Sequence, residues 1–402
     1  MTILGVTLIE SRDHMAKRKL IATAAMGIEA LVAKEVRDLG YTCEVENGRV
    51  YIDAEMEDIP RLNLWLRTAD RVKLVVAEFK ATTFTELFDG VVELPWTDLM
   101  PWDARFIVDG RSVKSKLFSI RDCQKITEKA IVDAMQRGYN KPGEWLPKTG
   151  AYYPIEVALL KDVATITIDT SGDALHRRGY RELHSQAPLK ETMAAAMIQL
   201  TNWKPDMPFY DVFTGSGTLA IEAALIGRNI APGLNREFCS QDWPCVPKKA
   251  WYEAINEANE KAEWDKPLKI YGIDLDPRMV KLAKDNAELA DVRDAITFVH
   301  SDAAALKPKE EYGVIIGNPP YGERLQTEEE IIDLYERIGQ QFAKYPGYSV
   351  YMLTSYEDFE KAYGRPATKR RKLYNGNIET QYYQYYGLRP KRRSTEPFVE
   401  GK

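Results

Sequence analysis

The sequence contains no run of about 18 apolar residues, and its first twenty residues mix apolar with charged ones. The absence of such a run excludes a helix that crosses a bilayer, and the charged residues near the N-terminus do not fit a secretory signal. With 45% hydrophobic and 29% charged residues, the 402-residue chain is too apolar for long disorder and large enough for two or three packed cores. We expect a soluble, cytoplasmic protein with no membrane partner.

Signatures of metal sites and of histidine-based hydrolases are scarce as well. The four cysteines are scattered and form no C-x-x-C pair, so neither a disulfide framework nor a zinc ribbon is expected, and no metal is predicted. Only four histidines occur, and none lies in a triad or metal-binding pattern. The chemistry must therefore be sought in other residue types.

The net charge of -5 conceals an uneven distribution. The stretch from Lys361 to Arg393 holds ten basic residues and one acid, a net charge of +9, so the remainder of the chain carries -14. Such a stretch can contact phosphate groups, although a solvated basic segment is the simpler explanation. Further basic residues lie between residues 105 and 129 and between residues 177 and 190.

The first 170 residues contain two small units with mixed strands and helices. Residues 1–18 show no clear pattern, and Met15 is a second possible start of translation. Residues 19–80 alternate as strand, helix (27–39), a strand pair broken at Asn47-Gly48, helix (60–69) and strand, which predicts a ferredoxin-like unit. Residues 81–170 predict helices at 84–94 and 122–137, a strand at 106–108, and a hairpin that turns at Lys161-Asp162.

After residue 171 the pattern changes to alternating strands and helices, which indicates a parallel sheet with helices on both faces. Strands are expected at 209–213, 269–273, 296–299, 313–316 and 349–353. Two further runs, at 372–374 and 381–386, flank Asn375-Gly376 and predict an antiparallel closing hairpin. The sequence thus predicts a doubly wound α/β domain at 171–393, followed by a tail at 394–402.

A glycine-containing loop follows the first strand of that domain, in the sequence DVFTGSGT (211–218). Gly215 and Gly217 allow the backbone to turn sharply and to approach a ligand closely. The pattern also matches a relaxed form of the dinucleotide-binding fingerprint, so an enzyme that uses a nicotinamide cofactor is an alternative. The next strand ends at Asp274, whose carboxylate suits the vicinal hydroxyls of a ribose. Because 57 residues separate Gly217 from Asp274, against about 20 in nicotinamide enzymes, that alternative is weak.

Two more strand ends carry polar residues. Asp302 follows the third strand, where its carboxylate can accept from an adenine amine or simply form a turn. Asn318-Pro319-Pro320-Tyr321 follows the fourth strand. An amide oxygen, backbone carbonyls fixed by proline and an aromatic ring suit a planar base with an amino group. As a mere turn this sequence is common, but its place at a strand end beyond a glycine loop favours a site.

These segments resemble the motifs of class I S-adenosylmethionine-dependent amino-methyltransferases. Three stretches, 169–181, 187–192 and NPPYGER (318–324), more particularly resemble the bacterial 23S ribosomal RNA guanine-N2 methyltransferases that carry an N-terminal THUMP domain. The resemblance extends from Lys19 to Leu388. It implies a Rossmann-like methyltransferase domain preceded by a THUMP module (81–170) that binds structured RNA and by a ferredoxin-like unit (19–80). Some members carry a second methyltransferase domain; here only the guanine-N2 half is expected.

The resemblance and the motifs together assign roles to individual residues. The catalytic residues are expected to be Asn318, Pro319, Pro320 and Tyr321. The residues expected to bind S-adenosylmethionine are Asp211, Phe213, Thr214, Gly215, Gly217, Thr218, Asp274, Leu275, Asp302, Ala303 and Asn318. The residues expected to contact RNA are Arg111, Lys114, Lys116, Arg177, Arg178, Arg181, Arg370, Arg371 and Lys372.

The expected activity is methyl transfer from S-adenosylmethionine to the exocyclic N2 amine of a guanine in 23S ribosomal RNA, free or in a precursor particle. An adenine-N6 methyltransferase that acts on DNA or RNA is an alternative, because Asn-Pro-Pro-Tyr serves either exocyclic amine. A non-catalytic RNA-binding assembly factor is a further alternative. The target nucleotide and the oligomeric state stay open.

Overall fold

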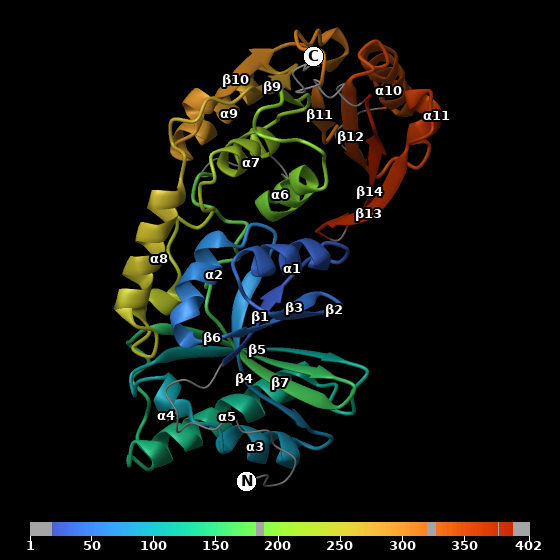
Figure 1. The fold of residues 1–402 in the computed structure, drawn as a ribbon. Helices are drawn as coiled ribbons and strands as arrows, with labels where there is room; N and C mark the ends of the chain where they lie inside the picture. The colour runs from blue at the N-terminus through green and yellow to red at the C-terminus, as the bar shows by residue number, and fades with distance from the viewer. Residues whose placement is uncertain (1–17, 182–188, 320–326, 377, 389–402) are drawn as a thin grey trace, which may run out of the picture. The chain divides into compact units, whose positions relative to one another are not determined.

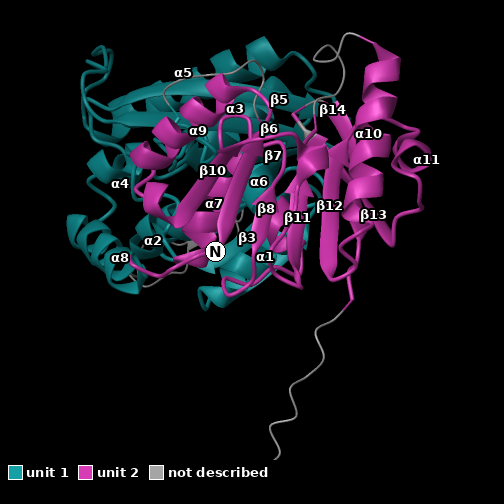
Figure 2. Cartoon of the chain, turned by 90° about the horizontal axis from the view of Figure 1, so that it is seen from above, with its two compact units in different colours: residues 1–181, 191–196, 229–264 teal, residues 182–190, 197–228, 265–402 magenta. Residues whose placement is uncertain are grey.

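A computed structural model describes residues 18–181, 189–319, 327–376 and 378–388 (Figure 1). The chain divides into two units (Figure 2). The first contains residues up to 181 together with 191–196 and 229–264, and the second contains 182–190, 197–228 and 265–402. Within the described ranges, no helix is long and apolar enough to cross a membrane.

The first unit is built on a seven-stranded sheet with the order β2-β3-β1-β4-β7-β6-β5. Neighbouring strands are antiparallel except β5 and β6, which run parallel. The strands are β1 (Arg18–Thr23), β2 (Cys43–Glu46), β3 (Arg49–Ala54), β4 (Arg71–Lys80), β5 (Arg105–Val113), β6 (Tyr152–Leu160) and β7 (Val163–Asp169). The helices are α1 (Glu29–Asp38), α2 (Ile59–Trp65), α3 (Phe84–Val92), α4 (Trp96–Leu99), α5 (Ile120–Gly138) and α8 (Lys248–Lys261).

The two N-terminal units predicted from the sequence share this one sheet. Strand β4 belongs to the expected ferredoxin-like part and pairs along its length with β7, which belongs to the expected THUMP part. The predicted turns lie where the backbone needs them: Gly48 has φ +75°, and Lys161 and Asp162 have φ of 51° and 66°. The boundary near residue 80 is therefore a boundary in sequence and not between sheets.

Residues 229–264, which lie between Gly217 and Asp274 in the sequence, fold onto the first unit. The guanidinium of Arg61 on α2 donates twice to the carboxylate of Glu257 on α8, at 2.8 and 3.0 Å. The indole of Trp243 stacks on the ring of Tyr153, with centroids 4.6 Å apart, and donates to the Tyr152 carbonyl. The insertion thus completes the core of the N-terminal unit.

The second unit is a seven-stranded sheet with the order β10-β9-β8-β11-β12-β14-β13. Strands β8 to β12 are parallel, and β14 and β13 close the sheet as an antiparallel hairpin, as predicted. The strands are β8 (Phe209–Asp211), β9 (Ile270–Asp274), β10 (Ile296–His300), β11 (Gly313–Gly317), β12 (Tyr348–Thr354), β13 (Lys369–Asn375) and β14 (Ile378–Tyr385). The helices are α7 (Thr218–Gly227), α9 (Pro277–Leu289), α10 (Glu328–Phe342) and α11 (Phe359–Tyr363); α6 (Glu191–Gln199) begins in the first unit.

Candidate active site

The sheet of the second unit brings the predicted motifs to one edge. Strand β8 lies between β9 and β11, and β10 lies beside β9. In register, Asp211 faces Ile316, and His300 faces Asp274. Since these strands are parallel, the segments that follow them emerge at the same carboxyl edge. The glycine loop, Asp274, Asp302 and Asn318 therefore share this edge.

The glycine loop after β8 is held against the sheet and open toward its outer side. The amide of Thr214 donates to the Ile273 carbonyl at 2.9 Å. Gly215 has φ +49°, and a Cβ atom there would meet no atom within 4 Å. Gly217 has φ +90° and caps α7, and its Cβ would lie 3.1 Å from the Cβ of Ala283 on α9. Gly217 thus serves the packing, whereas Gly215 leaves backbone exposed for a ligand.

The carboxylate of Asp274 organises the loops on both sides of it. One oxygen accepts from the Gly215 amide at 2.8 Å, and the other accepts from the Asp276 amide at 2.9 Å. Because each carboxylate oxygen has two lone pairs, both oxygens retain capacity for a diol. The next residue, Leu275, has a side chain that is 68% exposed. This pair offers hydrogen-bond acceptors beside a bare apolar surface, which suits a nucleoside.

Asp211 lies directly beneath the glycine loop and is completely buried. Its Oδ2 accepts from the Thr214 hydroxyl at 2.8 Å, and its Oδ1 has no hydrogen-bond partner within the described residues. Burial raises the pKa of Asp211 to about 7, with the neighbouring charge of Asp274 adding to the rise and the Thr214 hydroxyl opposing it. The carboxyl group therefore keeps its proton to a higher pH than an exposed aspartate does.

Asp302 is held by a partner that the sequence did not suggest. Its Oδ1 accepts from the Ala304 amide at 2.9 Å, so it caps a short 3-10 turn, and Ala303 is buried behind it. Its Oδ2 accepts from the guanidinium of Arg337 on α10 at 2.7 Å. Arg337 also binds Asp333 at 2.8 Å. The turn expected as the plain explanation of Asp302 is present, while its side chain stays about one-third exposed at the sheet edge.

Asn318 follows β11 and is half-buried. Its side-chain oxygen is buried and has no hydrogen-bond partner within the described residues. The preceding Gly317 allows Phe213 to pass closely, since a Cβ there would lie 2.8 Å from the Phe213 ring. An unpaired buried acceptor costs about 1–3 kcal/mol, so the site is prepared for a donor. Pro319 is described, whereas Pro320 and Tyr321 lie outside the described residues.

Three family models match the chain. An RlmL ferredoxin-like domain matches residues 19–73, a THUMP domain matches 81–169, and an RMKL-like methyltransferase domain matches 178–384. A Bacillus subtilis (strain 168) protein named "Putative RNA methyltransferase YpsC" is 54% identical over 383 residues, which cover 95% of this chain and 100% of that protein. The chain belongs to the THUMP-containing RMKL-like methyltransferases. The expected class I methyltransferase with ferredoxin-like and THUMP units is thereby confirmed.

Solved structures agree with this assignment. A predicted N6-adenine-specific DNA methylase from Listeria monocytogenes has a TM-score of 0.89 at 53% identity, over 93% of this chain and 97% of that one. SMU.472 complexed with SAH has a TM-score of 0.89 at 48% identity, over 94% and 100%. TrmN from Thermus thermophilus, at 22% identity and a TM-score of 0.67, supports the fold alone. The predicted cofactor, S-adenosylmethionine, is confirmed at the level of the family.

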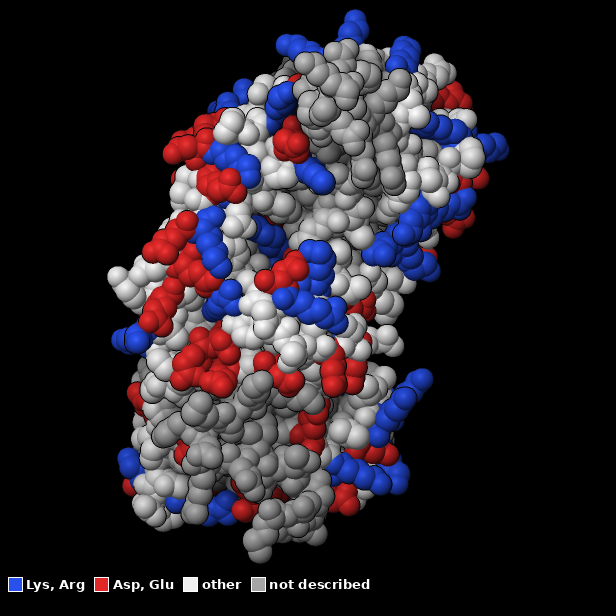
Figure 3. Space-filling view, in the orientation of Figure 1, with Lys and Arg blue, Asp and Glu red and all other residues white. Residues whose placement is uncertain are grey.

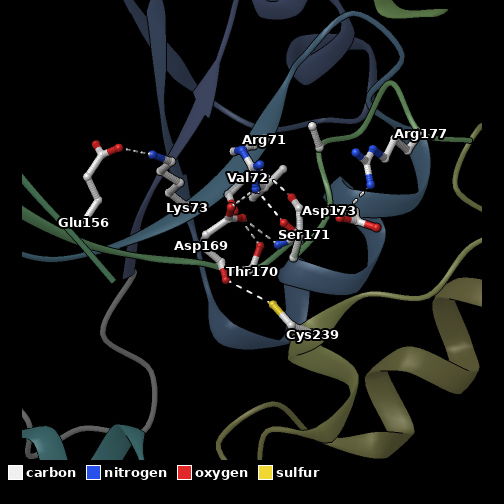
Figure 4. A network of polar contacts seen from close by, with 12 residues as sticks. Arg71, Val72, Lys73, Glu156, Asp169, Thr170, Ser171, Asp173, Arg177 and Cys239 are labelled. Carbon is white, nitrogen blue, oxygen red and sulfur yellow. Dashed lines mark hydrogen bonds and ion pairs between the residues drawn. The ribbon is translucent and has the colours of Figure 1, made fainter. Parts of the chain in front are cut away.

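The basic residues predicted between the THUMP part and the methyltransferase domain lie in different environments. Arg177 is 67% exposed and pairs with Asp173 at 3.4 Å (Figure 4). Arg178 is buried and donates to two backbone carbonyls, of Leu175 and Arg67, at 2.8 and 2.6 Å. The predicted contact of Arg178 with RNA is therefore wrong, because its guanidinium is buried and bound to carbonyls inside the fold.

Arg181, which was also predicted to contact RNA, likewise lies inside the fold. Its side chain is 9% exposed and pairs with the buried Glu191 at 3.2 Å. The residues that precede Arg181 link β7 to β4. The buried carboxylate of Asp169, at the end of β7, accepts from Arg71 on β4 and from the Ser171 amide (Figure 4). Burial raises the pKa of Asp169, against the opposing charge of Arg71. In this methyltransferase the stretch 169–181 therefore builds the N-terminal unit.

The other predicted RNA contacts lie on the surface. Arg111 is 55% exposed and 3.4 Å from Glu156, and Lys114 and Lys116 are exposed. On β13, Arg370 is exposed and pairs with Glu360, Lys372 pairs with Glu379 at 2.7 Å, and Arg371 is half-buried. Figure 3 shows lysine and arginine side chains gathered over this strand. The basic residues 389–393 lie outside the described residues.

Proposed function

We propose that this methyltransferase transfers a methyl group from S-adenosylmethionine to the N2 amine of a guanine in 23S ribosomal RNA. The observation that carries the proposal is the buried side-chain oxygen of Asn318 at the carboxyl edge of the sheet, which has no hydrogen-bond partner among the residues that the structure describes. An acceptor without a donor fits an incoming NH₂ group and does not fit a carbonyl. The edge that holds it also holds the open glycine loop.

The residues of the edge fit S-adenosylmethionine, which supplies an electrophilic methyl group on a sulfonium sulfur. The backbone at Gly215 is accessible to its methionine part, and Asp274 accepts from its ribose hydroxyls. Leu275 covers one face of its adenine, and Asp302 accepts from the adenine amine. Each of these residues binds and orients, and none forms a covalent bond.

On the substrate side, the Asn318 oxygen and the Pro319 carbonyl accept the two hydrogens of the target amine. This draws the nitrogen toward tetrahedral geometry and frees the lone pair that ring conjugation holds back. The nitrogen then attacks the methyl carbon, the carbon–sulfur bond breaks, and the amine releases a proton to solvent. Tyr321 stacks on the base, which must leave its RNA stack at a cost of a few kcal/mol. Catalysis rests on positioning and electrostatics.

RNA is the proposed substrate, since the THUMP match and the name of the Bacillus relative both support it. Arg111, Lys114, Lys116 and Arg177 are its proposed contacts in the first unit, with Arg370, Arg371 and Lys372 on β13. The substrate is free ribosomal RNA or a precursor particle. The cytoplasmic location stays a prediction.

Adenine-N6 methylation is the second candidate, because the Listeria relative is named for that reaction on DNA. To separate the two, the protein is incubated with S-adenosylmethionine carrying a labelled methyl group, and with either 23S ribosomal RNA or genomic DNA from cells that lack the enzyme. Mass spectrometry of the nucleosides should find the label in N2-methylguanosine from the RNA. Label in N6-methyladenosine would refute the proposal, and its absence from every nucleoside would favour a non-catalytic assembly factor.

A further inference from the structure

Hydrogen bonds join two segments of the first unit into a structure that we call the lysine tip. It consists of residues 113–118, from the last residue of β5 onward, and residues 160–163, from the last residue of β6 to the first of β7. The amide of Lys116 donates to Asp162 Oδ1 at 2.7 Å, and the Asp162 amide donates to the Ser115 hydroxyl at 3.0 Å. The Lys161 amide donates to the Val113 carbonyl at 3.2 Å. The side chain of Asp162 thus serves the fold of the tip.

Three residues of the lysine tip have positive φ, and two of them, Lys161 and Asp162, form the two-residue hairpin turn between β6 and β7. Lys114, Lys161 and Asp162 have φ of 51°, 51° and 66°, in the left-handed region that residues with a side chain rarely adopt. Residues with a side chain keep such a backbone conformation where the surrounding contacts hold it. The hydrogen bonds around Asp162 supply those contacts.

An apolar strip and an exposed ring lie on the lysine tip. Val113 pairs with Leu160, and Leu160 pairs with Val163, so the three side chains lie side by side on one face of the sheet. They are 50%, 41% and 43% exposed. Phe118 is 82% exposed. Burying these groups needs a partner with flat apolar surfaces.

Three lysines lie in the same two segments as these apolar side chains. Lys114, Lys116 and Lys161 are exposed, and none of their ammonium groups forms an ion pair within the described part of the chain. The one acid of the tip, Asp162, is already bound to backbone. Exposed cations in the same segments as exposed apolar side chains complement a ligand that carries both phosphates and flat rings. Unpaired nucleotides fit this description better than a duplex does.

We propose that the lysine tip binds an unpaired stretch of the RNA substrate, with a base stacked on Phe118 and phosphates beside the three lysines. This inference rests on the proposed RNA substrate, and it is independent of which amine is methylated. Contact with the phosphates of an RNA duplex alone would leave the Phe118 ring and the apolar strip exposed to solvent.

The test uses the full chain and two RNAs, a blunt stem-loop and the same stem-loop with a single-stranded tail. Loss of one stacked base costs about 1–3 kcal/mol, equivalent to about 5- to 150-fold in affinity. We expect Phe118→Ala to weaken binding of the tailed RNA by this factor, to leave the blunt RNA unchanged, and Phe118→Tyr to restore binding. Trp145→Ala, which removes a 94% exposed ring elsewhere in the unit, is the matched control and should change neither.

Replacing Lys114, Lys116 and Lys161 together by glutamine should lower the salt dependence of tailed-RNA binding by about two units of slope. Equal losses for both RNAs in Phe118→Ala, no loss for either, or no RNA binding by the natural protein would each overturn the proposal. So would Phe118-dependent sedimentation with phosphatidylglycerol vesicles while RNA binding is unchanged. A methylated nucleoside other than N2-methylguanosine would refute the proposed reaction and leave these outcomes intact.

Discussion

The raised pKa of Asp211 predicts a pH dependence of stability that a single substitution removes. The carboxyl group is buried, and its pKa rises from 3.8 to about 7 on folding. A folded-state pKa above the unfolded value means that the group costs no stability below about pH 4. The cost of ionising the buried carboxyl group grows between about pH 4 and about pH 7 and is constant at higher pH. At 1.36 kcal/mol per pKa unit, the full cost is at most about 4 kcal/mol.

Asp211→Asn has no ionisable group but keeps the oxygen that accepts from Thr214. We therefore expect the free energy of unfolding of the variant, minus that of the natural protein, to increase between pH 4.5 and pH 7.5 and to level off above. Urea unfolding across this range measures the difference, in which the other titrating groups cancel. A difference that is flat from pH 5 to 8 would refute the reasoning. Thr214→Val removes the donor that favours the ionised form, so it should move the change to higher pH.

Three further substitutions test other contacts. Arg61→Met removes the double hydrogen bond to α8 and should cost about 1–3 kcal/mol in urea unfolding, whereas Arg61→Lys should recover part of this. Gly179→Ala places a Cβ 1.9 Å from the Asn235 carbonyl oxygen at φ +98°, so it should cost more than about 1 kcal/mol; an unchanged melting temperature would contradict the packing. Arg337→Met releases Asp302 and should raise the Kd for S-adenosylhomocysteine about 5-fold or more in calorimetry, with Arg337→Lys closer to the natural protein.

The alternation of short strands and helices predicted most of the fold, and the errors have long-range causes. The helix expected at 60–69 ends at Trp65, because the amides of Arg67 and Thr68 donate to the carboxylate of Glu35 on α1. The strand expected at 106–108 extends from Arg105 to Val113. The second half of this strand was missed because charged residues interrupt its apolar pattern. In the structure they alternate with half-buried residues along the edge of the sheet.

The motifs of the candidate site could be predicted from the sequence, whereas the residues that hold other charged or polar groups in place could not. Glycine loops, acids at strand ends and Asn-Pro-Pro are local patterns, and parallel strands bring them to one edge. Arg337 lies 35 residues from Asp302, on a helix whose neighbour only the fold defines. Arg178 and Arg181 look like surface cations in the sequence, and carbonyls and a carboxylate distant in the chain place them inside. Local motifs can be identified in the sequence, whereas the partner of a charged side chain cannot.

The central claim is that the buried side-chain oxygen of Asn318 holds the target amine. Parallel measurements of S-adenosylmethionine binding by calorimetry and of labelled methyl transfer to ribosomal RNA, on the natural protein and on Asn318→Ala, test it most directly. The account predicts that the variant loses methyl transfer and largely retains cofactor binding. Near-normal turnover by Asn318→Ala would contradict it.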